Sequence, residues 1–187
     1  MTASGQPSRF ALFDGDAGDA LLLTGWLRSW QVEASDDPVP VFTAIEAALA
    51  AGQWVALAAD YGLGASFEAA VPPAPRGRPV LRAWLFAEGQ RLAAGAVNAF
   101  LAGRLATIPE HLRTAGIAEL TPAVDAATHT SQVRQILRWI ADGDCYQLNL
   151  TFPLTFQLYG HPLALYAGLR ERQPVRYGGY VDTAEAS

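Results

Sequence analysis

Apolar and polar side chains alternate strictly along residues 146–158. The apolar positions are Tyr146, Leu148, Leu150, Phe152, Leu154, Phe156 and Leu158. Because successive side chains of a strand point to opposite faces, this run predicts one long β-strand with an apolar face toward a core. Pro153 has no backbone N–H to donate, so we expect a bulge or a sheet edge at that position.

A helix is predicted immediately before this strand, over residues 130–142. Its apolar side chains recur at helical spacing and form one stripe, made of Val133, Ile136, Leu137 and Ile140. Thr128 or Thr130 can cap the start of the helix, and Gly143 can adopt the left-handed conformation at its end. The unit predicted here is therefore a helix, a tight Gly-Asp turn and a long amphipathic strand.

The rest of the chain alternates shorter strands and helices. Strands are predicted over residues 9–14, 20–24, 28–33, 54–60, 79–88 and 177–182, and helices over residues 41–51, 93–107 and 163–172. The strand over 54–60 is apolar at almost every position, which predicts burial on both faces. Residues 71–79 hold four prolines and predict a loop, and residues 111–125 read as a linker with one short strand. The predicted fold class is α+β.

Composition narrows the classes of protein that fit. The chain has 187 residues, a formal net charge of −5 and 51% hydrophobic residues, which suffices for one domain with a core or two small ones. Its basic residues are scattered, so we expect no nucleic-acid partner. No apolar run reaches the roughly 18 residues of a membrane span, and one cysteine argues for a reducing compartment. We therefore expect a cytoplasmic protein without a membrane contact.

Candidate chemistry is sparse. The chain contains no lysine, which excludes a Schiff base, a lysine nucleophile and a P-loop lysine. Asp14, Asp16 and Asp19 invite a calcium-loop interpretation, but the ligand spacing of such a loop fails, and a solvated hairpin turn is the better interpretation. No histidine or cysteine has metal-ligand spacing. We predict no catalytic residue and no metal ligand in these residues.

The residue identities around Gly143 carry more information than their periodicity. A helix ends in Gly143-Asp144 and leads through Cys145 into Tyr146-Gln147-Leu148-Asn149-Leu150. This string resembles the chorismate-utilising enzymes, and in particular component I of the aminodeoxychorismate (para-aminobenzoate) synthases, which read Tyr-Gln-x-Asn-Leu. Anthranilate synthase large subunits are similar here but usually read Phe-Gln-Val-Val-Leu. Tyr146 and Asn149 therefore favour the aminodeoxychorismate branch.

The resemblance implies a fold and an activity. Enzymes of this family use chorismate, Mg²⁺ and ammonia from a glutaminase subunit to make 4-amino-4-deoxychorismate for folate synthesis. A lysine in a Pro-Ile-Lys-Gly-Thr motif is thought to attack the substrate ring. The implied fold is an antiparallel β-sandwich with outer helices, to which both halves of the chain contribute strands. Residues 1–125 would be the variable N-terminal region and residues 126–187 the start of the chorismate-binding core, so we expect an N-terminal fragment that is inactive and binds no cofactor alone.

The resemblance also implies an amino-acid pocket. Leu22-Leu23-Thr24 is similar to the family's Leu-Leu-x-Ser strand, and Gln173-Pro174-Val175-Arg176-Tyr177 resembles its Asn-Pro-x-Pro-Tyr segment. In some members these two segments hold tryptophan, so the implied pocket residues are Leu23, Thr24, Pro174 and Tyr177. Gln173 and Arg176 depart from the family pattern. An anthranilate synthase fragment and a non-catalytic ligand-binding module remain alternatives.

Overall fold

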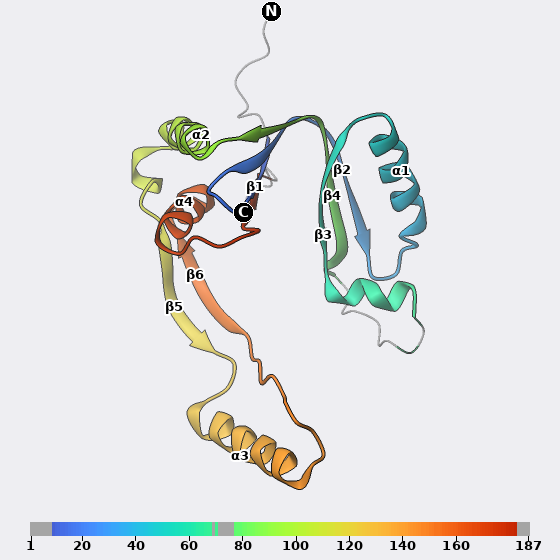
Figure 1. Ribbon diagram of the computed structural model, residues 1–187, viewed down its shortest axis with the longest axis vertical. Coiled ribbons are helices and arrows are strands. Elements are labelled where there is room, and N and C mark those ends of the chain that lie inside the picture. Colours follow the sequence, from blue (N-terminus) through green and yellow to red (C-terminus); the bar gives the residue numbers. More distant parts are fainter. Residues whose placement is uncertain (1–8, 69, 71–76, 183–187) are drawn as a thin grey trace, which may run out of the picture. The chain divides into compact units, whose positions relative to one another are not determined.

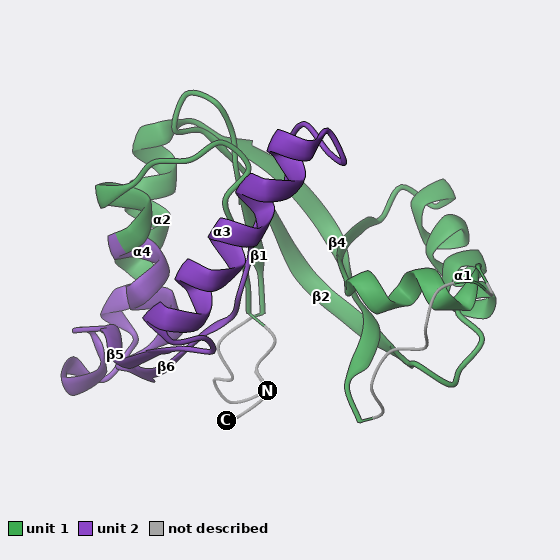
Figure 2. Ribbon diagram, turned by 90° about the horizontal axis from the view of Figure 1, so that it is seen from below, with its two compact units in different colours: residues 1–103, 169–187 green, residues 104–168 purple. Residues whose placement is uncertain are grey.

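A computed structural model describes residues 9–68, 70 and 77–182, and the chain divides into two compact units. Unit 1 is Met1–Gly103 together with Leu169–Ser187, and unit 2 is Arg104–Gly168 (Figure 2). Six of the nine residues predicted as a proline-rich loop, 71–76, lie outside the described residues. Each unit is considered by itself below.

Unit 1 contains a five-stranded antiparallel sheet in the order β3-β4-β2-β1-β7 (Figure 1). Its strands are β1 (Ala11–Asp14), β2 (Ala20–Glu33), β3 (Trp54–Ala59), β4 (Pro79–Leu92) and β7 (Gly179–Val181). The helix α1 (Val39–Ala50) and the 3₁₀ helix η1 (Tyr61–Ser66) also belong to this unit. Strands from both ends of the described chain therefore share one sheet.

Unit 2 contains a two-stranded antiparallel sheet of β5 (Gly116–Pro122) and β6 (Leu154–Tyr159), with the helix α3 (Ala126–Asp142) between them in sequence. A short 3₁₀ helix, η2 (Glu110–Leu112), precedes β5. Two helices, α2 (Ala94–Ala106) and α4 (Pro162–Arg172), run across the boundaries between the units along the chain. The mixture of helices and antiparallel strands confirms the predicted α+β class, whereas the face-to-face packing of two sheets stays a prediction.

One pair of predicted strands is a single strand. The prediction separated residues 20–24 from 28–33, but β2 runs without interruption through both. Gly25 has a φ of +68°, and the register against β4 shifts between Trp26 and Arg28. A bulge therefore bends β2 at this point and interrupts the alternation of apolar and polar side chains. In the sequence, that interruption is indistinguishable from the end of one strand and the start of another.

The predicted burial of residues 54–60 on both faces is wrong. β3 lies at the edge of the sheet and pairs only with β4, and its side chains Trp54 and Leu57 are exposed. An apolar run of strand length is compatible with a central strand and with a partly covered edge strand. The strands that pair with it come from elsewhere in the sequence, so the run alone does not tell the two apart.

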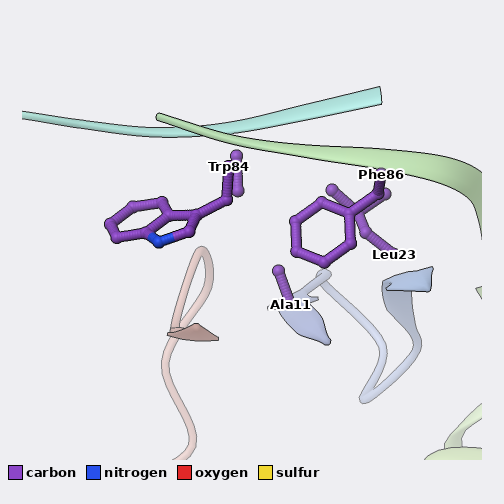
Figure 3. Close-up of a cluster of buried hydrophobic side chains, with 5 residues drawn as sticks. Ala11, Leu23, Trp84 and Phe86 are labelled. Atoms are coloured by element: carbon purple, nitrogen blue, oxygen red, sulfur yellow. The ribbon is translucent and has the colours of Figure 1, made fainter. Parts of the chain in front are cut away.

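The core of unit 1 joins side chains from four of its strands. Leu23 of β2 packs with Ala11 of β1, Trp84 and Phe86 of β4, and Ala56 of β3 (Figure 3). A second cluster, formed by Val32, Val80 and Leu81, lies under side chains of α1 and η1. Among the described helices, none combines the length and apolar character that crossing a bilayer requires.

We expect Phe86→Ala to destabilise unit 1 strongly, because Phe86 is 0% exposed and its ring fills the centre of the first cluster. Truncating a buried phenylalanine typically costs about 3–5 kcal/mol. The measurement is urea unfolding of both proteins followed by near-ultraviolet circular dichroism. Phe67→Ala is the matched control, since Phe67 is an exposed phenylalanine, and an equal loss of stability in both variants would contradict this core.

Candidate functional site

The helix and turn that carry the family-like residues form as predicted. α3 ends at Asp142, and Gly143 follows with a φ of +82°, in the left-handed region. The N–H of Gly143 donates to the carbonyl of Ile140 (3.3 Å), and the N–H of Asp144 donates to that of Trp139 (2.9 Å). These bonds close the last turn of the helix, and a glycine is favoured where φ is positive.

The start of α3 lies earlier than the prediction placed it. The carboxylate of Asp125 accepts a hydrogen bond from the N–H of Thr128 at 2.7 Å, so Asp125 is the cap, and neither Thr128 nor Thr130 is. The hydroxyl of Thr130 donates instead to the carbonyl of Ala126. The domain division predicted at residue 125 stays a prediction.

The long strand predicted over residues 146–158 is only half present. β6 covers Leu154–Tyr159, and residues 144–153 form neither helix nor strand. β5 is the strand that pairs with β6 in the described part of unit 2, and it ends at Pro122, opposite Leu154. The chain then turns into α3, so the ladder of β5 and β6 does not continue along residues 146–153, and a strand without a partner strand does not form.

The apolar row of this segment is exposed within unit 2. Leu154, Phe156 and Leu158 are all exposed on β6, as are Ile117 and Leu120 on β5. The predicted burial of the row is therefore wrong on β6, and also wrong for Tyr146 and Leu148, whereas Leu150 and Phe152 are half-buried. Pro153 lies just before the strand, where its carbonyl accepts a bond from the N–H of Ala123 (3.0 Å), in keeping with an edge position.

The residues that carry the family-like motif are open to solvent. Tyr146 is 91% exposed, and Gln147 and Asn149 are exposed as well. A phenol and two amides can donate and accept hydrogen bonds to a polar ligand. The exposed side chains of Tyr146, Gln147 and Asn149 therefore offer hydrogen-bonding groups for recognition.

The four residues of the implied amino-acid pocket all belong to unit 1. Leu23 and Thr24 lie side by side in β2, whereas Pro174 and Tyr177 lie in the loop between α4 and β7. β1 separates β2 from β7, since Leu23 pairs with Ala11 and Ala11 pairs with Val181. The loop with Pro174 and Tyr177 therefore leads into β7, a strand that β1 separates from β2.

Their side chains meet different surroundings. Leu23 is buried in the core, and the hydroxyl of Thr24 donates to Glu88 at 3.3 Å. Tyr177 has a φ of +63° and is 82% exposed. A tyrosine in the left-handed region is strained, and such strain gathers at functional sites. The pocket itself stays a prediction.

The acidic turn between β1 and β2 is neutralised by arginines from three separate segments. Asp14 pairs with Arg170 (2.6 Å), Asp16 with Arg176 (3.1 Å) and Asp19 with Arg91 (3.7 Å). A hairpin turn was predicted here, but the solvated interpretation is wrong for Asp14, which is buried. The calcium interpretation gains no support, because each carboxylate already faces a cation.

Metal-ligating side chains do not gather elsewhere in the described chain. Residues 9–68, 70 and 77–182 contain no group of three or more His, Cys, Asp or Glu side chains that could hold a metal ion. The ring of His129 packs edge-on against Phe152, and Nδ1 of His161 accepts a bond from the N–H of Leu163 at the start of α4. These contacts give both side chains structural roles.

Comparison with known proteins identifies the family. Residues 42–187 match the model of the family described as chorismate binding enzyme. The chain belongs to the chorismate binding enzyme family. That match covers β3, β4 and β7 of unit 1 and all of unit 2, so membership does not depend on the strand that is only half formed.

A curated relative is also similar to part of the chain. Over 85 residues the chain is 35% identical to anthranilate synthase component 1 of Thermus thermophilus. The aligned part covers 46% of this chain but only 18% of that protein. No solved structure gives a significant match.

We expect the cap of α3 to titrate at acidic pH. The hydrogen bond from the backbone N–H of Thr128 lowers the pKa of Asp125 below the ordinary value of 3.8. A lowered pKa in the folded state means that the stabilisation is present above 3.8 and is lost as the pH falls through the folded pKa. The chemical shift of the Thr128 amide, followed by nuclear magnetic resonance, should therefore change with a midpoint below 3.8.

Asp125→Asn is the matched control, because asparagine also caps helices but has no carboxylate to titrate. Its Thr128 amide should show no such transition. A midpoint at or above 3.8 in the unsubstituted protein would contradict the cap.

Proposed function

We propose that these residues are the N-terminal part of component I of an aminodeoxychorismate synthase. The whole protein would use Mg²⁺ and ammonia from a glutaminase subunit to convert chorismate to 4-amino-4-deoxychorismate for folate synthesis. The observation that supports this most is the turn at Gly143-Asp144 that leads into Tyr146-Gln147-Leu148-Asn149-Leu150. Family membership supports the use of chorismate, and Tyr146 with Asn149 favours this product.

In this proposal, the present residues supply part of the scaffold, and the remainder of the whole protein supplies the reactive groups. The chain has no lysine, so it cannot supply the lysine that the resemblance assigns to attack on the substrate ring. Its exposed Tyr146, Gln147 and Asn149 would contact a ligand or other parts of the protein rather than break bonds. The exposed apolar row of β6 is a surface that the rest of such a protein would cover.

Synthesis of anthranilate is the second candidate. The curated relative is an anthranilate synthase component 1, and its identity of 35% over 85 residues favours this branch. The reaction would take the same substrate and the same source of ammonia to a different product. The motif and the relative therefore point to two branches of one family.

We further propose that Leu23, Thr24, Pro174 and Tyr177 border a pocket for tryptophan or a similar amino acid. The support is that β2 and β7, the strand that follows the loop, belong to one sheet, and that Tyr177 keeps a strained backbone. An apolar wall with an exposed aromatic ring is typical of indole binding.

The product test separates the two branches. The whole protein, given chorismate, ammonium and Mg²⁺, should form aminodeoxychorismate, which a separate lyase converts to para-aminobenzoate for chromatography. Chelation of Mg²⁺ should abolish the product. Anthranilate, detected by its fluorescence, would contradict this assignment and support the second candidate.

The 187 residues by themselves should consume no chorismate under the same conditions, because the proposed lysine chemistry is missing. The control is the whole protein at equal concentration in the same buffer. Turnover by the 187 residues alone would contradict the proposed division between scaffold and chemistry.

A further inference from the structure

Arg170 connects three segments that are far apart in sequence. Its Nε donates to Oδ1 of Asp14 (2.6 Å), its second guanidinium nitrogen Nη2 to the carbonyl of Gly18 (2.6 Å), and Nη1 to Oδ1 of Asn98 (3.1 Å). The side chains of Arg170 and Asp14 are only 16% and 7% exposed. The pair is therefore shielded from the water and salt that weaken surface ion pairs.

Asp14 also contacts the loop before β7, so it links Arg170 to that loop. Its backbone N–H donates to the carbonyl of Gly178 at 2.7 Å. A Cβ atom added to Gly178 would lie 2.7 Å from Oδ2 of Asp14, so the carboxylate rests directly against the backbone of the loop. Arg170 holds the carboxylate from one side, and the end of the loop occupies the other.

The loop itself, residues 173–178, has a second and weaker ion pair. Arg176 contacts Asp16 at 3.1 Å, but both side chains are mostly exposed. Exposed pairs contribute little, whereas removal of one member of a buried pair leaves a charge without its counterion. Of the two pairs, the one between Arg170 and Asp14 therefore decides where the loop lies.

We propose that Arg170 is a positioning residue for the loop 173–178, acting through Asp14 and Gly178. It thereby fixes the place of Pro174 and Tyr177, and this consequence rests on the amino-acid pocket of the proposed function. Arg170 touches no ligand in this proposal. Its guanidinium sets the loop conformation in which the strained Tyr177 is presented.

The direct test is hydrogen exchange of the Asp14 amide, measured by nuclear magnetic resonance in the full chain. Arg170→Gln should speed that exchange at least about tenfold, while the amides of the β2–β4 pair keep their rates. Arg170→Lys keeps the positive charge but loses the planar guanidinium with its several donors. Its Asp14 amide should therefore exchange at a rate between those of Arg170→Gln and the unsubstituted protein. A purely general loss of stability would instead speed all these amides together.

Arg172→Gln is the matched control, because Arg172 is an exposed arginine on the same helix. Its Asp14 amide should exchange as in the unsubstituted protein. Equal exchange of the Asp14 amide in Arg170→Gln and Arg172→Gln would overturn the proposal.

A second variant keeps the test valid where Arg170→Gln does not fold. Gly178→Ala places a methyl group against the Asp14 carboxylate and should speed the same amide without touching Arg170. Gly168→Ala is its control, because nothing lies within 4 Å of a Cβ added there. Exchange of the Asp14 amide that is unchanged in Gly178→Ala would also overturn the proposal.

Tryptophan titration by calorimetry tests the consequence separately. If the pocket exists, Arg170→Gln should weaken tryptophan binding at least about tenfold relative to Arg172→Gln. Absence of tryptophan binding by the unsubstituted protein would overturn the pocket, while fast local exchange in Arg170→Gln would still support the positioning of the loop. Tight tryptophan binding that Arg170→Gln leaves unchanged would overturn the link between Arg170 and the pocket.

Discussion

The pairing of β2 with β4 is the interaction on which unit 1 depends. Each strand has 14 residues, and their ladder runs from Ala20 opposite Leu92 to Glu33 opposite Pro79. β4 carries β3 on its free side, and β2 carries β1 and then β7. Because every buried backbone N–H and carbonyl needs a partner, this one ladder provides the edges on which the other three strands form.

The same requirement explains why unit 2 is less complete. Residues 146–153 have the side-chain alternation of a strand, yet β5, which pairs with β6 in the described part of unit 2, ends at Pro122 opposite Leu154, so the ladder does not extend along them. Alternation specifies which face of a strand would be buried, but hydrogen bonding to a neighbour decides whether the strand forms. The segment therefore keeps the sequence of a strand without its conformation, and the side chains of Tyr146 and Leu148 stay exposed.

Local features were predictable from sequence, and non-local ones were not. Gly143 ends α3 because the left-handed residue is specified by the glycine itself, and most helices and strands formed within a few residues of their predicted ranges. The edge position of β3 and the merging of two predicted strands into β2 depend on partners elsewhere in the chain. The contact of Arg170 with Asp14 spans 156 positions, and no sequence pattern marks it.

The exclusive use of arginine as the long basic side chain has two opposite consequences for this protein. A chain that contains arginine but no lysine cannot form a Schiff base or use a lysine nucleophile, since the guanidinium stays protonated and is a poor nucleophile. A guanidinium, however, presents several donors in one rigid plane, and Arg170 uses them on a carboxylate and a carbonyl at the end of β1 and in the turn after it, and on an amide of α2. A lysine ammonium is a compact point charge and could not reproduce that planar set of contacts. The replacement of lysine by arginine that excludes lysine chemistry is therefore also suited to holding distant segments together.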